Sequence, residues 1–184
     1  MLGSNLVILR RYSLEDAPKL FEAISTSVER VYPWLPWCHP NYTLEETEAW
    51  LKTKPQRWNE SKEFGFSIRD CQNRIVGGCG IGIGTKPWSG NLGYWLRTGF
   101  TGKGYATAAT KLLAKFGILE LQLKRIEIVA SIENIPSQKV AERAGAYKEG
   151  ISRNRLLIHG KLHDAVIYSF IPQDFDKHNQ SKSN

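Results

Sequence analysis

The chain of 184 residues lacks the segments that would place it in a membrane or a secretory pathway. No apolar run approaches the roughly 18 residues that a membrane-spanning helix needs. The first residues, Met1 to Leu6, have neither the basic nor the apolar region of a secretory signal. We therefore expect neither a membrane protein nor a secreted one.

Cysteine and blocks of like charge are also scarce. The three cysteines, Cys38, Cys71 and Cys79, are an odd number without metal-ligand spacing, so neither a disulfide framework nor a zinc site is predicted. The formal net charge of +7 is spread along the chain, without the basic arm that is typical of nucleic-acid binding. We expect a cytoplasmic protein with reduced thiols, no metal and no direct contact with nucleic acid.

The remaining composition, 41% hydrophobic and 23% charged, is that of an ordinary globular domain. We predict a single domain over residues 1–173 and a polar, disordered tail over 174–184. Periodicity predicts strands at 5–10, 64–69, 75–83, 91–97, 125–131, 147–158 and 163–170. Helices are predicted at 14–27, from 43 onward, after 104 and at 136–144, with a Pro- and Trp-rich loop at 32–40.

Two local patterns sharpen this outline. Thr43 and Glu46 have the spacing of a helix capping box. The glycine-rich run from Gly77 to Gly84 is not followed by a predicted helix. We therefore interpret it as glycine within a sheet, at a bulge or a close approach, in preference to a phosphate loop.

The segment from Asn91 to Ala106 carries the strongest functional signal, because it predicts a strand that enters a glycine turn and then opens a helix. Gly102 and Gly104 let a ligand lie against the backbone, and the first turn of a helix offers amide N–H groups without intrahelical partners. These amides and the helix dipole favour an anion. The sequence therefore predicts a phosphate-binding turn.

A dinucleotide or a nucleoside triphosphate fits this turn poorly. The turn lies in mid-chain, the next strand does not end in an acidic residue, and no second βαβ half follows, as a dinucleotide fold would require. A nucleoside-triphosphate loop needs Ser or Thr after its lysine, whereas Lys103 is followed by Gly104.

Several ordered motifs resemble one family. Thr101-Gly-Lys-Gly-Tyr-Ala106 resembles the acyl-CoA loop, Gln/Arg-x-x-Gly-x-Gly/Ala, of the GNAT N-acetyltransferases. The stretch 131–150, with Asn134, Ser137 and a short helix that ends at Gly145, is similar to the family's second signature. The stretches 160–164 and 34–37 look like the RimJ/RimL subgroup of ribosomal-protein N-terminal acetyltransferases. The resemblance covers about residues 6–172, and several motifs in order are more specific than one.

The resemblance implies the α/β (α+β) GNAT acyl-CoA N-acyltransferase fold, a mixed, mostly antiparallel sheet of about seven strands with a splayed pair and about four flanking helices. It implies acetyl-CoA as co-substrate, with the pantetheine arm in the splayed gap. Cofactor binding is then expected at the main chain of Trp95, Leu96 and Arg97, at Thr101, Gly102, Lys103, Gly104, Tyr105 and Ala106, and at Asn134 and Ser137.

Ser137 is the catalytic residue that the resemblance implies, because a Ser at this place in RimL proteins lies near the coenzyme sulfur and can protonate the departing thiolate. The alternative is structural: Asn134 and Ser137 flank Pro136 at a helix start, where both residue types satisfy free amides. Capping and catalysis do not exclude one another.

A general base is not evident in the sequence. Two family positions that often carry Glu align with Asn91 and Leu156, neither of which can accept the proton; Glu133 and His39 remain as candidates. Near pH 7, on the order of a tenth of an α-amine is uncharged, against about one part in a few thousand of a lysine amine. A site without a carboxylate base therefore favours an α-amine.

Tyr32, Trp34 and Trp37 are candidate substrate-binding aromatics, although Trp34-Leu-Pro-Trp37 fits a rigid packing corner equally well. The pair His163-Asp164 is interpreted as an anchor of the closing hairpin.

We predict an acetyl-CoA-dependent N-acetyltransferase that acts by direct attack of a primary amine, such as the N-terminal α-amine of a ribosomal protein. Two alternatives stay open. One is acetylation of a small amine, such as an amino acid or an aminoglycoside, and the other is an acyl-CoA-binding regulatory module without turnover. The natural acceptor, the acyl length and the oligomeric state are left open.

Overall fold

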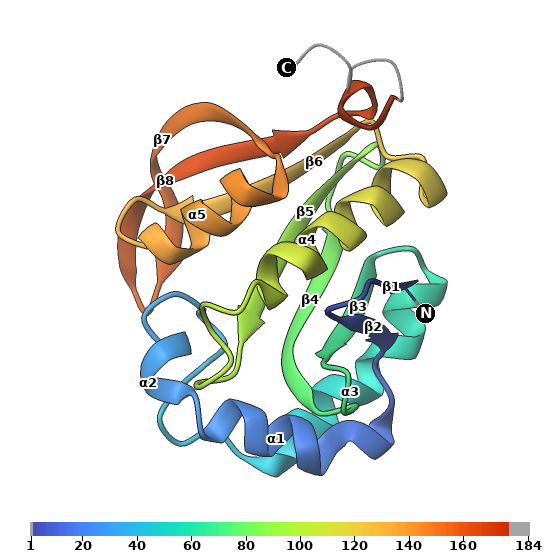
Figure 1. The fold of residues 1–184 in the computed structure, drawn as a ribbon. Helices are drawn as coiled ribbons and strands as arrows, with labels where there is room; N and C mark the ends of the chain where they lie inside the picture. The colour runs from blue at the N-terminus through green and yellow to red at the C-terminus, as the bar shows by residue number, and fades with distance from the viewer. Residues whose placement is uncertain (1, 177–184) are drawn as a thin grey trace.

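The computed structural model describes residues 2–176, which form one eight-stranded sheet and five α-helices (Figure 1). The strands are β1 Leu2–Gly3, β2 Ile8–Arg11, β3 Glu63–Arg69, β4 Ile75–Ile83, β5 Ser89–Leu96, β6 Arg125–Ser131, β7 Tyr147–Ile158 and β8 Lys161–Phe170. The helices are α1 Ala17–Ser25, α2 Val28–Val31, α3 Leu44–Asn59, α4 Tyr105–Lys115 and α5 Ile135–Ala144. Three short 3-10 or π-helical turns are η1 Leu14–Asp16, η2 Phe116–Glu120 and η3 Pro172–Phe175.

The predicted mixed α/β architecture is confirmed, with differences in count. The sheet has eight strands where about seven were expected, because the two-residue β1 pairs with β2. There are five α-helices in the described range where about four were expected, because α2 adds one turn before the Pro- and Trp-rich loop. The predicted tail falls largely on residues 177–184, which lie outside the described residues, while Asp174 and Phe175 belong to η3.

The sheet order is β1-β2-β3-β4-β5-β6-β8-β7, and in the described sheet β5 and β6 are the only parallel neighbours. They pair over three residues each, from Ser89 to Asn91 and from Arg125 to Glu127. β5 continues to Leu96 and β6 to Ser131 without further pairing to each other, while β5 still pairs with β4 and β6 with β8. Figure 1 shows the two strands diverging beyond this point, so the splayed pair that the resemblance implied is present.

Helices cover both faces of the sheet. α4 crosses the front of the sheet in Figure 1, and its Ala109 and Leu113 are fully buried in the main core with Leu92 of β5. On the opposite face, Leu20 of α1 and Leu51 of α3 pack in a second core against which Trp95 lies. Successive side chains of β5 thus point to opposite faces, as strand geometry requires.

The helix from residue 44 begins as predicted. Thr43 Oγ1 accepts a hydrogen bond from the Glu46 amide at 3.3 Å, and Glu46 Oε2 accepts one from the Thr43 amide at 2.9 Å. This reciprocal pair satisfies two amides that an α-helix start leaves free. It sets the point at which α3 begins, and hence the position of the aromatic side chains on α3.

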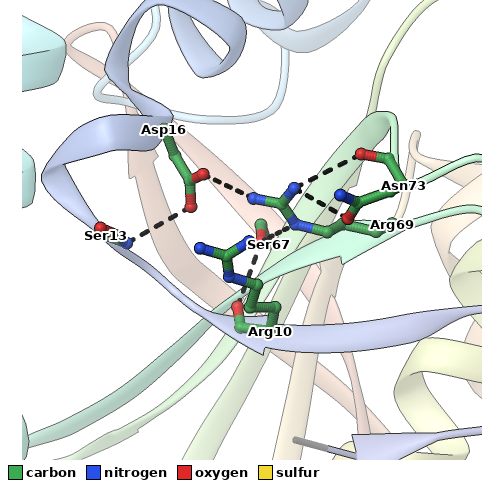
Figure 2. Close-up of polar contacts among 6 residues, drawn as sticks. All are labelled: Arg10, Ser13, Asp16, Ser67, Arg69 and Asn73. Carbon is green, nitrogen blue, oxygen red and sulfur yellow. Dashed lines mark hydrogen bonds and ion pairs between the residues drawn. The ribbon is translucent and has the colours of Figure 1, made fainter.

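A buried polar network fixes the segment between β2 and α1 (Figure 2). Arg69 Nη2 donates to Asp16 Oδ1 at 2.6 Å, and both side chains are buried. Ser67 Oγ donates to the Arg10 carbonyl and accepts from Arg69 Nε, each at 3.1 Å, while the Ser13 amide donates to Asp16 Oδ2. These contacts tie the segment to β3, and removing one partner of the buried ion pair would cost about 3–5 kcal/mol because the other charge would be left unpaired.

Candidate active site

Two cavities meet at β5, one on each side of the strand. The larger, of about 830 Å³, lies along the splayed gap between β5, β6, α5 and the loop before α4. The smaller, of about 640 Å³, lies over β3, β4 and β5 on the side of α1 and α3. The residues that line both are Leu35, Asn91, Gly93, Tyr94 and Trp95. Both volumes are in the usual range for small-molecule sites.

The glycine turn opens α4 at the edge of the larger cavity. Gly102 and Gly104 have φ of +76° and +81°, in the left-handed region that favours glycine. Gly104 is the N-cap of α4 and provides no side chain to its first amides. Thr101, Gly102 and Gly104 line the cavity together with Ala106. Free amides and the positive end of the helix dipole therefore face this space, which suits an anion.

Ser137 lies across the same cavity, near the start of α5. The Tyr94 hydroxyl of β5 is 3.0 Å from Ser137 Oγ and 2.9 Å from the Ser137 carbonyl oxygen, to which it donates. When Tyr94 donates to that carbonyl, Ser137 Oγ can donate to Tyr94. Burial raises the pKa of Tyr94 to about 12, so the tyrosine keeps its proton at neutral pH.

Asn134 caps α5, as the structural interpretation of the sequence proposed. Its Oδ1 accepts a hydrogen bond from the Ser137 amide at 3.1 Å. Asn134 also lines the larger cavity, as does Ser137. The Ser137 amide donates to the Asn134 side chain that caps α5, while the Ser137 hydroxyl contacts Tyr94. A structural role and a role at the cavity are therefore compatible for both Asn134 and Ser137.

The two cavities differ in charge. Arg30, Lys139, Arg143 and Arg155 line the larger cavity, and among the described residues no carboxylate does. Glu46 and Glu63 line the smaller one, where no described Lys or Arg does. These four basic residues come from α2, α5 and β7, so no local sequence pattern groups them and their gathering at one cavity was not predicted. The larger cavity thus suits a polyanion and the smaller one does not.

The predicted cofactor-binding residues are divided by the structure. Trp95, Leu96, Thr101, Gly102, Gly104, Ala106, Asn134 and Ser137 line the larger cavity. Arg97, Lys103 and Tyr105 do not line it. Arg97 donates to Glu22 Oε1 at 2.6 Å, and its amide donates to the Val76 carbonyl. The Lys103 ammonium lies 5.3 Å from the centre of the Phe100 ring, and Tyr105 is partly buried against the core.

The three candidate substrate-binding aromatics also separate. Trp37 lines the smaller cavity, with its ring centre 6.1 Å from that of Trp95. Trp34 lines the larger cavity. Tyr32 lines neither of the two and is stacked on His159 at 4.0 Å. Two of the three aromatic residues of this loop thus line a cavity, and the third packs against another side chain.

The positions considered for a general base differ in their distance from the two cavities. Asn91 lines both cavities and Leu156 the larger one. His39 Nε2 lies 2.8 Å from Oε1 of Glu46, which lines the smaller cavity. Glu133 lies 3.8 Å from His163 Nδ1 and lines neither of the two cavities. His39 with Glu46 is thus the nearer of the two candidate groups to the smaller cavity.

Asp164 anchors the closing hairpin, as expected for the His163-Asp164 pair. Its Oδ1 accepts a hydrogen bond from the Asn154 amide at 2.8 Å, across an irregular stretch of β7. Within residues 2–176, no cluster of three or more His, Cys, Asp or Glu side chains could hold a metal ion. No helix in the same range is long and apolar enough to cross a membrane.

Comparisons with known proteins agree with this geometry. Candidate ribosomal N-acetyltransferase YdaF of Bacillus subtilis (strain 168) is 39% identical over 85 residues, which is 46% of this chain and 46% of YdaF, so the match spans about half of either protein. A structure described as a candidate ribosomal-protein-serine acetyltransferase from Vibrio cholerae is 27% identical, with a TM-score of 0.80 over 94% of this chain and 98% of its own. RimL, a ribosomal L7/L12 α-N-protein acetyltransferase solved with coenzyme A, has a TM-score of 0.83 at 22% identity and covers 91% of this chain and 95% of its own, which shows a shared fold. The family model of the acetyltransferase (GNAT) domain matches residues 7–147, and the chain belongs to the GNAT acetyltransferase family.

Proposed function

We propose that the protein transfers an acetyl group from acetyl-CoA to a primary amine, and that the amine is the free N-terminal α-amine of a peptide or protein. One observation carries this proposal: a cation-lined cavity with a helix N-terminus meets a cavity without cations at a single strand, β5. Membership of the GNAT family supports the acetyl-transfer chemistry.

Coenzyme A fits the larger cavity. Its pyrophosphate would lie on the free amides of the turn from Thr101 to Gly104, where the helix dipole favours an anion. Arg30, Arg143 and Arg155 supply positive charge for its other phosphate. From Leu92 to Leu96, β5 pairs with β4 but not with β6, so its edge on the β6 side would offer backbone groups to the amides of the pantetheine arm.

The thioester then lies where the two cavities meet, close to Tyr94 and Ser137. The amine nitrogen attacks the thioester carbonyl carbon, the C–S bond breaks, and the nitrogen loses one proton while the sulfur gains one. Ser137 would donate its proton to the sulfur and regain one from Tyr94, which takes a proton from solvent water because its pKa of about 12 favours the protonated hydroxyl; the proton that the nitrogen loses goes to water.

The acceptor amine would come from the smaller cavity. Asn91 and Leu156 occupy the two positions where a carboxylate was expected, and no described Asp or Glu lines both cavities, so an amine that is already partly neutral has the advantage. An N-terminal α-amine meets this condition and a lysine side chain does not. The relatives named above as ribosomal N-acetyltransferases support a protein acceptor, and a ribosomal protein is one such acceptor.

A thiol-release assay tests the proposal. Peptides with a free α-amine and no lysine are compared with N-terminally blocked peptides that carry one lysine, and with an amino acid amide and an aminoglycoside. We expect release only when an α-amine is offered. Preference for the blocked lysine peptide or the aminoglycoside would overturn the α-amine assignment. Binding of acetyl-CoA without release for any amine would instead favour a regulatory module, which the absence of a carboxylate at Asn91 and Leu156 makes worth testing.

A further inference from the structure

One face of the sheet is almost bare of side chains inside the smaller cavity. The strand registers place three rows of residues side by side across β3, β4 and β5. The rows are Glu63–Gly82–Asn91, Gly65–Gly80–Gly93 and Ser67–Gly78–Trp95. Since residues directly opposite one another share a face, five of these nine positions are glycines that point toward α1 and α3.

Two of the five glycines serve packing. A Cβ on Gly65 would lie 3.2 Å from the Tyr12 ring, and one on Gly78 would clash with the Tyr12 hydroxyl and lie 2.7 Å from Trp95 Nε1. The network of Figure 2 holds Arg10 and Ser13 on either side of Tyr12, so the ring is fixed over these two positions. Close approach therefore explains Gly65 and Gly78, and for Gly78 it is one of the two reasons, bulge or close approach, that the sequence suggested for the run 77–84.

The other three glycines do not serve packing by side chains. A Cβ on Gly82 or Gly93 would have no neighbouring atom within 4 Å, and one on Gly80 would meet only backbone, the nearest atom at 3.1 Å. All three line the smaller cavity. Neighbouring strands lie about 4.8 Å apart, and residues two apart on a strand about 6.8 Å, so the three form a flat floor that matches the footprint of one ring.

Aromatic side chains make the walls above this floor. Trp37 stands edge-on to Tyr42 and to Trp95, at ring-centre distances of 5.9 and 6.1 Å, and Trp50 stands edge-on to Tyr12 at 4.9 Å. All five rings line the cavity. Trp37 and Trp50 are 41% and 37% exposed, whereas tryptophan side chains are on average largely buried. Their rings are therefore accessible to a ligand in the cavity.

The carboxylates at the rim of the cavity already have polar partners within the protein. Glu63 accepts from Lys54 Nζ and Arg57 Nε, both at 2.6 Å, and Glu46 is 2.8 Å from His39 Nε2. Two cations match the charge of Glu63, and Glu46 also accepts from the Thr43 amide, so both acids are already held by groups of the protein. The cavity is thus built to recognise shape and apolar surface more than charge.

From the glycine floor and the aromatic walls, we propose that the smaller cavity binds an aromatic ring on the acceptor, so that the preferred amine is the α-amine of an N-terminal Phe, Tyr or Trp. The inference rests on the proposed acetyl transfer. The floor includes Gly93 and adjoins Asn91, and both residues also line the larger cavity, so a ring on the floor would leave its α-amine next to the thioester. A Ser or Ala side chain would leave the floor uncovered.

Amides of single amino acids test the proposal with a minimal acceptor. Phenylalaninamide and alaninamide have similar amines and differ in the ring, so binding to the protein with coenzyme A is measured by calorimetry and turnover by thiol release. Burial of the ring predicts binding and kcat/KM about 10- to 30-fold in favour of phenylalaninamide. Equal values for the two amides would overturn the aromatic pocket and leave acetyl transfer standing. Preferential binding of phenylalaninamide without turnover of any amine would support the pocket and overturn the proposed function.

A floor variant locates the effect. Gly82→Val places two methyl groups on the floor at a strand position that has room for a Cβ and where Val is a good strand former. Gly84→Val, two residues further on and also without neighbours within 4 Å, lies outside the cavity and serves as the matched control. We expect Gly82→Val to reduce the preference for phenylalaninamide about tenfold and Gly84→Val to keep it. Equal preference in both variants, with unfolding temperatures and coenzyme A affinity like those of the wild type, would overturn the floor assignment.

Discussion

The two cavities on either side of β5 are built by opposite means. The larger cavity is marked by a helix N-terminus at Gly104 and by cations such as Arg155. The other is made of bare strand backbone and aromatic rings, from Gly82 to Trp37. A phosphate needs charge and free amides wherever it binds, whereas an acceptor is recognised by shape. The turn of the larger cavity therefore leaves a local motif in the sequence, although its cations do not. The glycine surface of the smaller cavity forms only when three strands are in register.

The most damaging substitution should be one in the glycine turn of the larger cavity. Gly104→Val puts a β-branched residue at a φ of +81°, at the N-cap of α4. Left-handed strain of about 1–2 kcal/mol and a side chain in the phosphate site should reduce acetyl-CoA affinity by about 100-fold or more. Isothermal calorimetry measures this loss.

The control for strain alone is Gly160→Val. Gly160 has a φ of +78° in the β7–β8 turn, far along the chain from the loop, and a Cβ there meets nothing within 4 Å. It should lower the unfolding temperature much as Gly104→Val does while acetyl-CoA affinity stays at the wild-type value. Undiminished binding by folded Gly104→Val would show that the turn does not hold the phosphates.

The pH dependence of kcat/KM tests which kind of amine the protein accepts. Without a strong base, kcat/KM should rise roughly tenfold per pH unit until the pKa of the acceptor amine, near 8 for an α-amine, and then level off. The pKa of Tyr94, about 12, is too high to bend the profile in this range. Because that value exceeds the roughly 10 of an unfolded tyrosine, stability from this residue should be lost only as the pH rises from 10 to 12.

Two acceptors of different pKa provide the check on this profile. Phenylalaninamide and an amine of higher pKa, such as phenethylamine, should give profiles that shift with the amine. Profiles that coincide, with a midpoint near pH 6, would reveal a titrating base in the enzyme and would remove the reason to prefer α-amines over lysine.

Ser137→Ala should have a smaller effect, confined to turnover. The cap of α5 survives, because Asn134 Oδ1 accepts from the Ser137 amide and not from its hydroxyl. Loss of a proton donor that acts on the developing thiolate should lower kcat about 10- to 100-fold, with acetyl-CoA affinity nearly unchanged. Steady-state kinetics and calorimetry separate the two quantities.

Tyr94→Phe is the companion variant to Ser137→Ala. The Tyr94 hydroxyl contacts Ser137, and burial raises the pKa of Tyr94. Removing this hydroxyl should lower kcat only if Ser137 needs it to regain its proton. A double variant no slower than Ser137→Ala would place the two residues in one relay. Unchanged turnover in Ser137→Ala would reduce Ser137 to a residue of the helix start.

The sequence predicts most of the fold because most of its signals are local. The capping box of Thr43 and Glu46, the strand 125–131 and the turn at Gly104 each lie within a few residues and were placed correctly. β1 and α2 were missed because two strand residues and four helical residues are too short to show a period. These elements are defined by contacts with the rest of the fold, such as the pairing of β1 with β2.

The site was predictable only in part, for the same reason. Tyr94 and Ser137 are 43 residues apart, so their contact has no pattern in the sequence. Alternation with Leu92 could have placed the Tyr94 side chain on the α4 face of β5, but not against α5. The glycine run showed its strand role, yet its open floor depends on the pairing of Gly80 with Gly93 of another strand. Lys103 was expected at the coenzyme because it lies in the motif, and the structure puts it over Phe100.

The smallest expected effect distinguishes the cap from cofactor binding at Asn134. Asn134→Asp keeps the oxygen that accepts the Ser137 amide, and Asp is as good an N-cap as Asn, so stability should stay within about 0.5 kcal/mol of the wild type. The variant removes the amide NH2 and adds a negative charge beside a polyanion, so acetyl-CoA affinity should fall about 5- to 10-fold. Asn134→Ala, which loses both functions, should cost about 1 kcal/mol of stability as well. Calorimetry and thermal unfolding of both variants measure these quantities, and wild-type affinity in Asn134→Asp would show that Asn134 only caps α5.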